Sequence, residues 1–235
     1  MLGGMGPLAS AVFVQTIYEH SVGEYEQQFP AVVLHSDPTF PARAVFLQEG
    51  TDELLGRVLD ATGRLFAHGC STIIMCCMTL HHLLPELPGA VRHRVVSVVD
   101  VLMAGVVAAA PKRHLMLCSR EARELGVFTR HPQWPLVRPF VVWPGAEDQQ
   151  SLQAAIWDIK LHGAGAASLT WLKATLLRYG TPSFIVGCSE VHLLAKQCNA
   201  LPGIASIDPF DVLARAVALH RLDALRSELC EFASA

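Results

Sequence analysis

Two short segments of the sequence each place a cysteine at the end of an apolar, strand-like run. Cys77 follows the β-branched run at 72–75, and Cys188 follows the run at 184–186, each with a helical pattern after it. Two matched thiols on opposite sides of one small molecule can exchange a proton at carbon, because one thiolate removes the proton from one face while the other thiol delivers a proton to the opposite face. The segments therefore indicate a racemase or epimerase that works without a cofactor.

Each cysteine is expected at a strand end near the N-terminus of a helix, where the helix dipole lowers the pKa of a thiol. A zinc site is an alternative reading, because Cys77 and His81 are four residues apart and His82 or Cys188 could complete the ligand set. That spacing is unspecific, and adjacent histidines at the start of a helix are more often surface or capping residues. We therefore expect no metal.

Composition narrows the class of protein. The chain of 235 residues is 51% hydrophobic and has a formal net charge of −3, with Lys and Arg mixed along it rather than gathered in a basic stripe. The longest nearly uncharged apolar stretch, 95–110, is interrupted by Asp100 and is shorter than the roughly 20 residues of a membrane-spanning helix. We expect neither nucleic acid nor a membrane as a partner.

Cysteine usage indicates the compartment. The chain has seven cysteines, an odd number, and no charged-then-apolar leader at its N-terminus. A disulfide framework is therefore improbable, and we expect a reducing cytoplasm.

Short β-branched runs alternate with amphipathic helical patterns, which is typical of an α/β fold. The predicted strands are 31–35, 71–75, 94–99, 114–118, 139–142 and 184–186, and the predicted helices are 7–21, 51–67, 147–162, 166–179 and 209–232.

Because one cysteine segment falls in each half, we expect two similar α/β lobes, each with a mostly parallel sheet flanked by helices, and an active site in the cleft between them. The first lobe would comprise 1–96 plus 206–235, and the second 97–205. The glycine-rich turn at 3–6 has almost no strand before it, so either the edge of the first sheet is shortened or the true start lies upstream.

Over nearly its whole length the chain resembles the aspartate/glutamate racemase superfamily, and most closely its cofactor-independent aspartate racemase branch. The matching pieces, in the family's order, are 3–10, 37–43, Cys77 with Thr79 and His81, Lys160, 187–190 and 207–212.

The resemblance implies that Cys77 and Cys188 are the catalytic acid/base pair and that no cofactor is needed. The substrate-binding residues that it implies are Met5, Arg43, Met78, Thr79, Ser119, Lys160, Ser189 and Glu190. The guanidinium of Arg43 would pair with a substrate carboxylate. Glu190 would accept a hydrogen bond from the α-ammonium of the substrate or hold the loop that contains Glu190.

The sequence departs from the family pattern at two places. Met78 stands where the family has asparagine, and it cannot donate a hydrogen bond to substrate. The segment Cys118-Ser119-Arg120-Glu121 stands where the family has Thr-x-Gly-Thr, so Ser119 is at best a partial substitute and Arg120 could contact an extra anionic group if it faces the cleft. These changes predict an altered substrate.

The leading hypothesis is an isomerase that racemises aspartate or a related acidic amino acid. One alternative is a racemase-like isomerase or decarboxylase that acts on a non-amino diacid. Another is an inactive homologue that binds a ligand. The apolar helix faces are also compatible with a homodimer.

Overall fold

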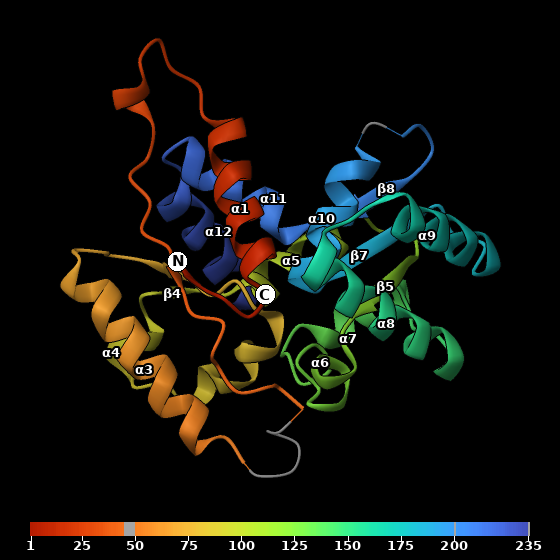
Figure 1. Cartoon of the computed structure of the whole chain (residues 1–235), viewed down its shortest axis with the longest axis horizontal. Coiled ribbons are helices and arrows are strands. Elements are labelled where there is room, and N and C mark those ends of the chain that lie inside the picture. The colour runs from red at the N-terminus through yellow and green to blue at the C-terminus, as the bar shows by residue number, and fades with distance from the viewer. Residues whose placement is uncertain (45–49, 200, 235) are drawn as a thin grey trace.

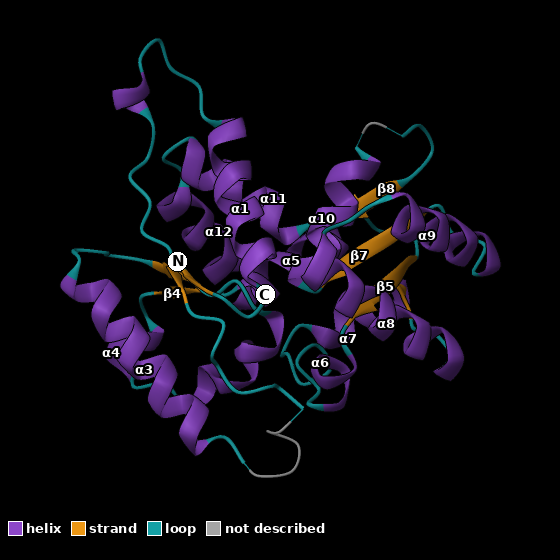
Figure 2. Ribbon diagram, viewed as in Figure 1, coloured by secondary structure: helices purple, strands orange, loops and turns teal. Residues whose placement is uncertain are grey.

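The computed structural model of this chain describes residues 1–44, 50–199 and 201–234, which form two α/β lobes (Figures 1 and 2). This confirms the expected fold class. No helix within these ranges is long and apolar enough to cross a membrane.

The first lobe holds short parallel strands. β1 (Leu2–Gly3) pairs with β2 (His35–Ser36), and β3 (Ile73–Ile74) pairs with β4 (Val95–Val96). A parallel bridge between Leu2 and Met75 joins the two pairs, so the strands follow the order β2-β1-β3-β4. The helical elements of this part are α1 (Pro7–His20), η1 (Glu26–Gln28), α3 (Asp52–Ala67), η2 (Met78–Glu86) and α4 (Gly89–Arg92).

The second lobe repeats this arrangement. Its parallel sheet has the order β6-β5-β7-β8, which is the same order as in the first lobe when each set is numbered from its first strand. The strands are β5 (His114–Cys118), β6 (Val141–Val142), β7 (Ser183–Gly187) and β8 (Ala205–Ile207). The helical elements here are α5 (Val98–Ala108), α6 (Arg120–Glu124), α7 (Trp134–Val137), η3 (Arg138–Phe140), α8 (Ala146–His162), α9 (Ala166–Arg178) and α10 (Ser189–Cys198).

Helix α3 shows how local pattern determines an element. Its buried residues Leu54, Val58, Ala61 and Leu65 recur at three- and four-residue steps, so one stripe faces the core. Acidic residues in its first turn complement the positive end of the helix dipole. The predicted helix 51–67 is confirmed to within one residue.

Other boundaries differ from the prediction. The predicted helix 209–232 is two helices, α11 (Pro209–Ala218) and α12 (Leu222–Ser234), because the chain turns at His220, whose φ is +54°. The predicted strand 94–99 ends early because Ser97 caps α5 by accepting a hydrogen bond from the backbone of Asp100.

Two further strands, one in each lobe, are shorter than predicted. Of the predicted strand 31–35 only His35 lies in β2, and residues 31–34 are irregular. The predicted strand 139–142 is reduced to β6 because 138–140 form the 3₁₀ turn η3. In contrast, the predicted strand 114–118 matches β5.

The chain returns to the first lobe after β8. Ser206 and Ile207, which we assigned to the first lobe, pair with β7 in the second sheet. The chain crosses to the first lobe after Ile207, at Asp208, which caps α11. Helix α11 then packs on α1, where Phe13 and Phe210 meet edge to face at 5.7 Å (Figure 1). Buried residues of both lobes form one continuous core.

Candidate active site

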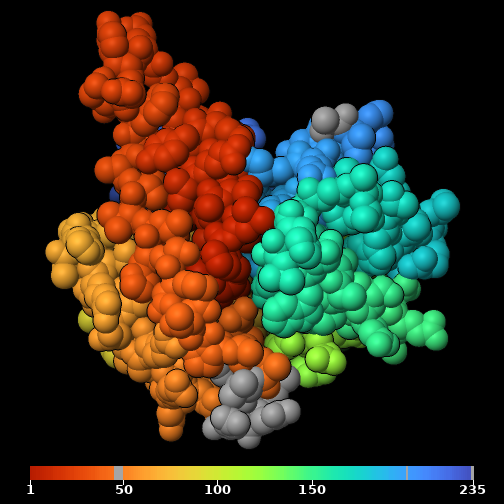
Figure 3. Space-filling model, in the orientation of Figure 1, coloured from red at the N-terminus to blue at the C-terminus, as the bar shows by residue number. Residues whose placement is uncertain are grey.

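A cavity of about 370 Å³ lies at the carboxyl ends of the central strands of both lobes. The first lobe contributes the loop after β1 (4–7), parts of 38–44, and Cys77 with Met78 after β3. The second contributes Ser119 and Glu121 after β5, one face of α8, and 188–190 after β7. Parallel α/β sheets bind ligands at this end, where the strand order reverses. In Figure 3 the red and orange N-terminal part meets the green-to-teal second lobe along a seam.

Cys77 and Cys188 occupy equivalent positions in the two lobes and line this one cavity. Each has an extended backbone and is the N-cap of the helix that follows, η2 for Cys77 and α10 for Cys188. Their exposed fractions are only 6% and 9%. The structure therefore brings together the two thiols that the sequence singled out.

Cys188 is in direct contact with a carboxylate. Its Sγ donates a hydrogen bond to Oε2 of Glu190 at 2.8 Å. Burial of the thiol and the negative charge of Glu190 raise the pKa of Cys188 well above its ordinary value, and the ammonium of Lys160 opposes them only in part. The pKa of Cys188 thus departs in the opposite direction from the one expected for a thiol at a helix N-terminus, and burial is the largest cause.

Glu190 is almost fully buried, with 1% of its surface exposed. Ser189 also donates its hydroxyl to Oε2, at 3.1 Å, so this hydroxyl is used within the protein rather than offered to a ligand as we expected. The other oxygen, Oε1, accepts no hydrogen bond from any residue that the structure describes. The ammonium of Lys160 lies 3.8 Å from it. Oε1 is thus a buried acceptor beside the cavity, with the Lys160 ammonium near it but beyond hydrogen-bond distance.

Two glycines in the loop after β1 make close approaches. Gly4 has a φ of +95°, and a Cβ there would lie 2.2 Å from the backbone nitrogen of Asp37. A Cβ on Gly6 would lie 2.4 Å from Oε1 of Glu190. Only glycine lets this loop lie against both neighbours without displacing them.

Arg43 and Met5 meet at the cavity wall, as do Lys160 and Trp157. The guanidinium of Arg43 donates to the carbonyl oxygens of Met5, at 3.2 Å, and Pro41, at 3.3 Å. The ammonium of Lys160 lies 4.9 Å from the centre of the Trp157 ring. Arg43, Lys160 and Met5 all line the cavity, as the resemblance implies for them.

His81 supports Cys77 from behind. Its Nδ1 lies 3.1 Å from the carbonyl oxygen of Cys77, and its Nε2 accepts the backbone N–H of Val98 at 3.0 Å. The ring is therefore neutral with its proton on Nδ1, and burial lowers its pKa to about 4. Both ring nitrogens are engaged by the backbone.

The zinc alternative does not fit this geometry. Within the described parts of the chain, no group of three or more His, Cys, Asp and Glu side chains is placed to hold a metal ion. The ring nitrogen of His81 that has a free lone pair, Nε2, would have to give up its buried hydrogen bond from Val98 to become a ligand.

The residues after β5, and Thr79 of η2, match expectation only in part. Ser119 lines the cavity and caps α6 by accepting from the backbone of Ala122. Thr79 does not line the cavity and lies behind it, with its hydroxyl 3.4 Å from that of Ser119. Arg120 is exposed outside the cavity, so it cannot contact a bound anion there. Glu121 lines the cavity instead.

Sequence reasoning missed several lining residues. Glu121 could have been found, because an acidic residue stands where the resemblance places the second threonine of Thr-x-Gly-Thr. Gln153, Trp157 and Leu161 lie on the same face of α8 as Lys160. The first three follow one another at four-residue steps, and Lys160 is three residues after Trp157. This helical spacing was the available signal. Phe40 carried no signal of its own.

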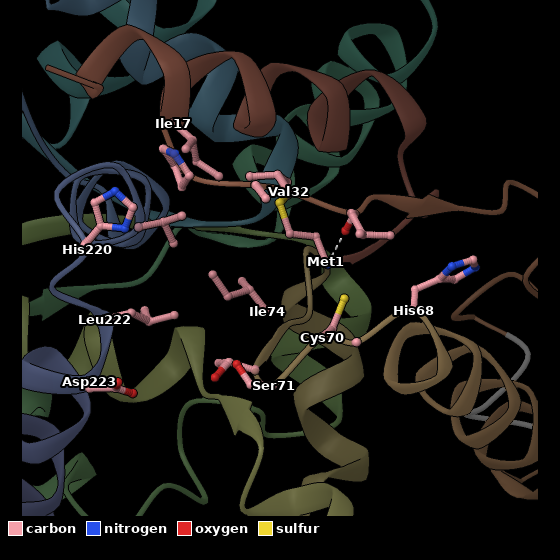
Figure 4. Close-up of a pocket in the computed structure, with 16 residues that line it drawn as sticks. Met1, Ile17, Val32, His68, Cys70, Ser71, Ile74, His220, Leu222 and Asp223 are labelled. Atoms are coloured by element: carbon pink, nitrogen blue, oxygen red, sulfur yellow. Dashed lines mark hydrogen bonds between the residues drawn. The ribbon is translucent and has the colours of Figure 1, made fainter. Parts of the chain in front are cut away.

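A second, larger cavity of about 580 Å³ lies at the start of β1, away from the two thiols (Figure 4). The N-terminal ammonium of Met1 donates to the carbonyl oxygen of Val33 at 2.6 Å there, and burial lowers its pKa. His68 and His220 lie on opposite sides of this cavity. Its ionisable groups do not converge on one point, so we take the cavity between the thiols as the candidate active site.

Comparison with known proteins shows the family and the fold to which the chain is similar. The profile of the Asp/Glu/Hydantoin racemase family matches residues 2–217. Aspartate racemase from Picrophilus torridus is similar in structure, with a TM-score of 0.79 and 21% identity over 94% of this chain and 92% of that one. An aspartate racemase homologue from Pyrococcus horikoshii gives 0.66 and 19% over 100% and 97%. Glutamate racemase from Campylobacter jejuni gives 0.59 and 14% over 93% and 85%. At these identities the structural likeness shows the fold.

Proposed function

The chain belongs to the Asp/Glu/Hydantoin racemase family, and we propose that it racemises an α-amino acid without a cofactor, using Cys77 and Cys188 as the acid/base pair. One observation carries the proposal: two thiols at equivalent positions in the two lobes line a single cavity. A site of this kind supplies both proton-transfer groups from the chain itself.

The two thiols would start in different states. Cys188 donates to the Glu190 carboxylate and has a raised pKa, so it holds its proton in the resting protein. Cys77 is then the group that, as a thiolate, removes the α-proton from one face. Cys188 delivers its proton to the opposite face of the planar carbanion, and the C–H bond that forms replaces the one that was broken. For the opposite enantiomer the two roles are exchanged.

Binding would use the unpartnered groups of the cavity. Oε1 of Glu190 would accept a hydrogen bond from the α-ammonium, which also offsets the repulsion between Glu190 and a Cys188 thiolate. The α-carboxylate would lie near Arg43 and the first turns of η2 and α10, where backbone N–H groups and the helix dipole favour an anion. An electron-withdrawing ammonium and a bound carboxylate both stabilise charge that develops at the α-carbon.

Aspartate or a related amino acid is the substrate that the resemblance implies. The aspartate and glutamate racemases among the structural neighbours are named for amino acids with a second carboxylate. The two free thiols also suit a reducing compartment, and we place the protein in the cytoplasm. A homodimer stays a prediction.

The test is α-proton exchange in heavy water, followed by proton NMR on purified protein with a reductant and a panel of L-amino acids. We expect one amino acid to lose its α-proton signal and to appear as the D form. Cys77→Ser and Cys188→Ser should each abolish racemisation, whereas Cys230→Ser, at an exposed position outside the cavity, should not.

Two outcomes would contradict the proposal. Full racemisation by both cavity cysteine variants would show that the thiols are not the acid/base pair. Exchange on no amino acid, with turnover of maleate-like or arylmalonate-like compounds, would instead favour an isomerase or decarboxylase of diacids.

A further inference from the structure

Glu121 places a second carboxylate in the cavity, on the side of the second lobe. It is in the first turn of α6, directly after the end of β5, and only 8% of its surface is exposed. It lines the cavity together with Ser119. Its position relative to β5 corresponds to that of the glycine loop relative to β1.

The Glu121 side chain is held from α8. Gln153 donates from Nε2 to Oε2 of Glu121 at 3.5 Å, and its Oε1 accepts the backbone N–H of Arg120 at 2.9 Å. Gln153 therefore bridges the loop and orients the carboxylate. Within the described residues, the carboxylate of Glu121 has no ion pair with a lysine or arginine.

Among the residues that the structure describes, the two cations that line the cavity both have other roles before a second substrate carboxylate is bound. Lys160 is paired with Glu190, and Arg43 is beside the loop after β1, where we place the α-carboxylate. A β- or γ-carboxylate would share a cavity of about 370 Å³ with the carboxylate of Glu121. Two carboxylates confined to a partly desolvated cavity of this size repel each other strongly.

Much of the remaining wall is apolar. Met5, Met78 and Phe40 are each at most 5% exposed and line the cavity, and Trp157 adds an aromatic face. Thioether side chains adapt to uncharged groups of different shapes, and none of these four residues offers a charge to an anion.

We propose that Glu121 determines substrate class: it excludes aspartate and glutamate, and the substrate is an α-amino acid with an uncharged side chain. This inference rests on the proposed racemase function. It replaces the expectation of an acidic substrate, because the cavity would reject a second carboxylate.

The experiment compares isosteric substrates that differ in one charge. We would measure kcat/KM for α-proton exchange with asparagine against aspartate, glutamine against glutamate, and methionine and lysine as further uncharged and cationic substrates. The kcat/KM for asparagine or glutamine should exceed that for the corresponding acid by at least about tenfold. Glu121→Gln should raise the aspartate-to-asparagine ratio by about tenfold or more.

The control is Glu124→Gln, which makes the same charge change on the exposed side of α6. It should leave the ratio unchanged. A preference for aspartate in the native protein, a preference for lysine, or equal ratios in the two variants would overturn the proposal. General damage to the site would lower kcat/KM for both aspartate and asparagine and leave their ratio unchanged.

Exchange on no amino acid would be a failure of the proposed function and not of this inference. Calorimetric binding of aspartate and asparagine to the native protein and to Glu121→Gln then decides the matter. A gain of aspartate affinity in the variant relative to asparagine supports the role of Glu121, and an unchanged ratio of affinities overturns it.

Discussion

The thiol of Cys188 donates a 2.8 Å hydrogen bond to the carboxylate of Glu190, two residues further along the chain. In the other lobe, the residue two places after Cys77 is Thr79, whose hydroxyl lies against Ser119 instead. Two segments that match in backbone geometry thus give their thiols different electrostatic surroundings. This asymmetry, together with burial, favours the protonated form of Cys188.

Glu190→Gln should make Cys188 more reactive. The negative charge of Glu190 is one cause of the raised pKa of Cys188, so removal of that charge lowers the pKa and raises the thiolate fraction at a given pH. We expect alkylation of Cys188 by iodoacetamide to become faster at pH 8 and its pH profile to move to lower pH. Peptide mass spectrometry would follow the modification at this cysteine. An unchanged profile, with Glu124→Gln as control, would show that burial alone sets the pKa.

Gly6→Ala should reduce activity far more than stability. A Cβ at this position would lie 2.4 Å from Oε1 of Glu190, so the carboxylate must move away from the place where we expect the α-ammonium. We expect a loss of at least about tenfold in kcat/KM, or about 1.4 kcal/mol of transition-state binding. Gly63→Ala is the matched control, because a Cβ there meets nothing within 4 Å. Native activity in Gly6→Ala would place the ammonium elsewhere.

His81 should contribute to acid lability. Its folded pKa is lowered to about 4 from 6.5, so the unfolded chain binds more protons in this range and the stabilisation is lost as pH falls from 6.5 through 4. The linked loss between pH 7 and pH 4 is about 3 kcal/mol. In His81→Gln, whose amide can bond to the same two backbone groups, urea unfolding should show a pH dependence weaker by about that amount. An equal effect of His82→Gln would argue against His81 as the source.

Asp208→Ala should destabilise the protein at the point where the chain returns to the first lobe. Asp208 caps α11 by accepting from the backbone of Phe210 and Asp211, and its other oxygen binds Nδ1 of buried His192 at 2.6 Å. Loss of the cap and of the partner of His192 should cost about 2–4 kcal/mol in the free energy of unfolding. Urea titration would measure this. Asp223→Ala, at an exposed position in the first turn of α12, should cost less than about 0.5 kcal/mol.

Much of the fold could be predicted because its signals are local. The apolar spacing in α3 and the apolar run of β5 gave their bounds to within a residue. The division between α11 and α12 could not be predicted, because it depends on a positive φ at His220 while the apolar pattern continues across the turn. The short strands of the first lobe depend on pairing between distant segments, which one segment cannot reveal.

The sequence by itself determined that Cys77 and Cys188 end equivalent strands, because strand endings and helix starts are encoded over a few neighbouring residues. Only the tertiary structure decided what surrounds them. Glu121 enters the cavity and Arg120 does not, because the turn of α6 directs adjacent side chains to different sides. The pKa of Cys188 is raised although it caps a helix, because burial and a neighbouring carboxylate depend on the packing of the whole molecule.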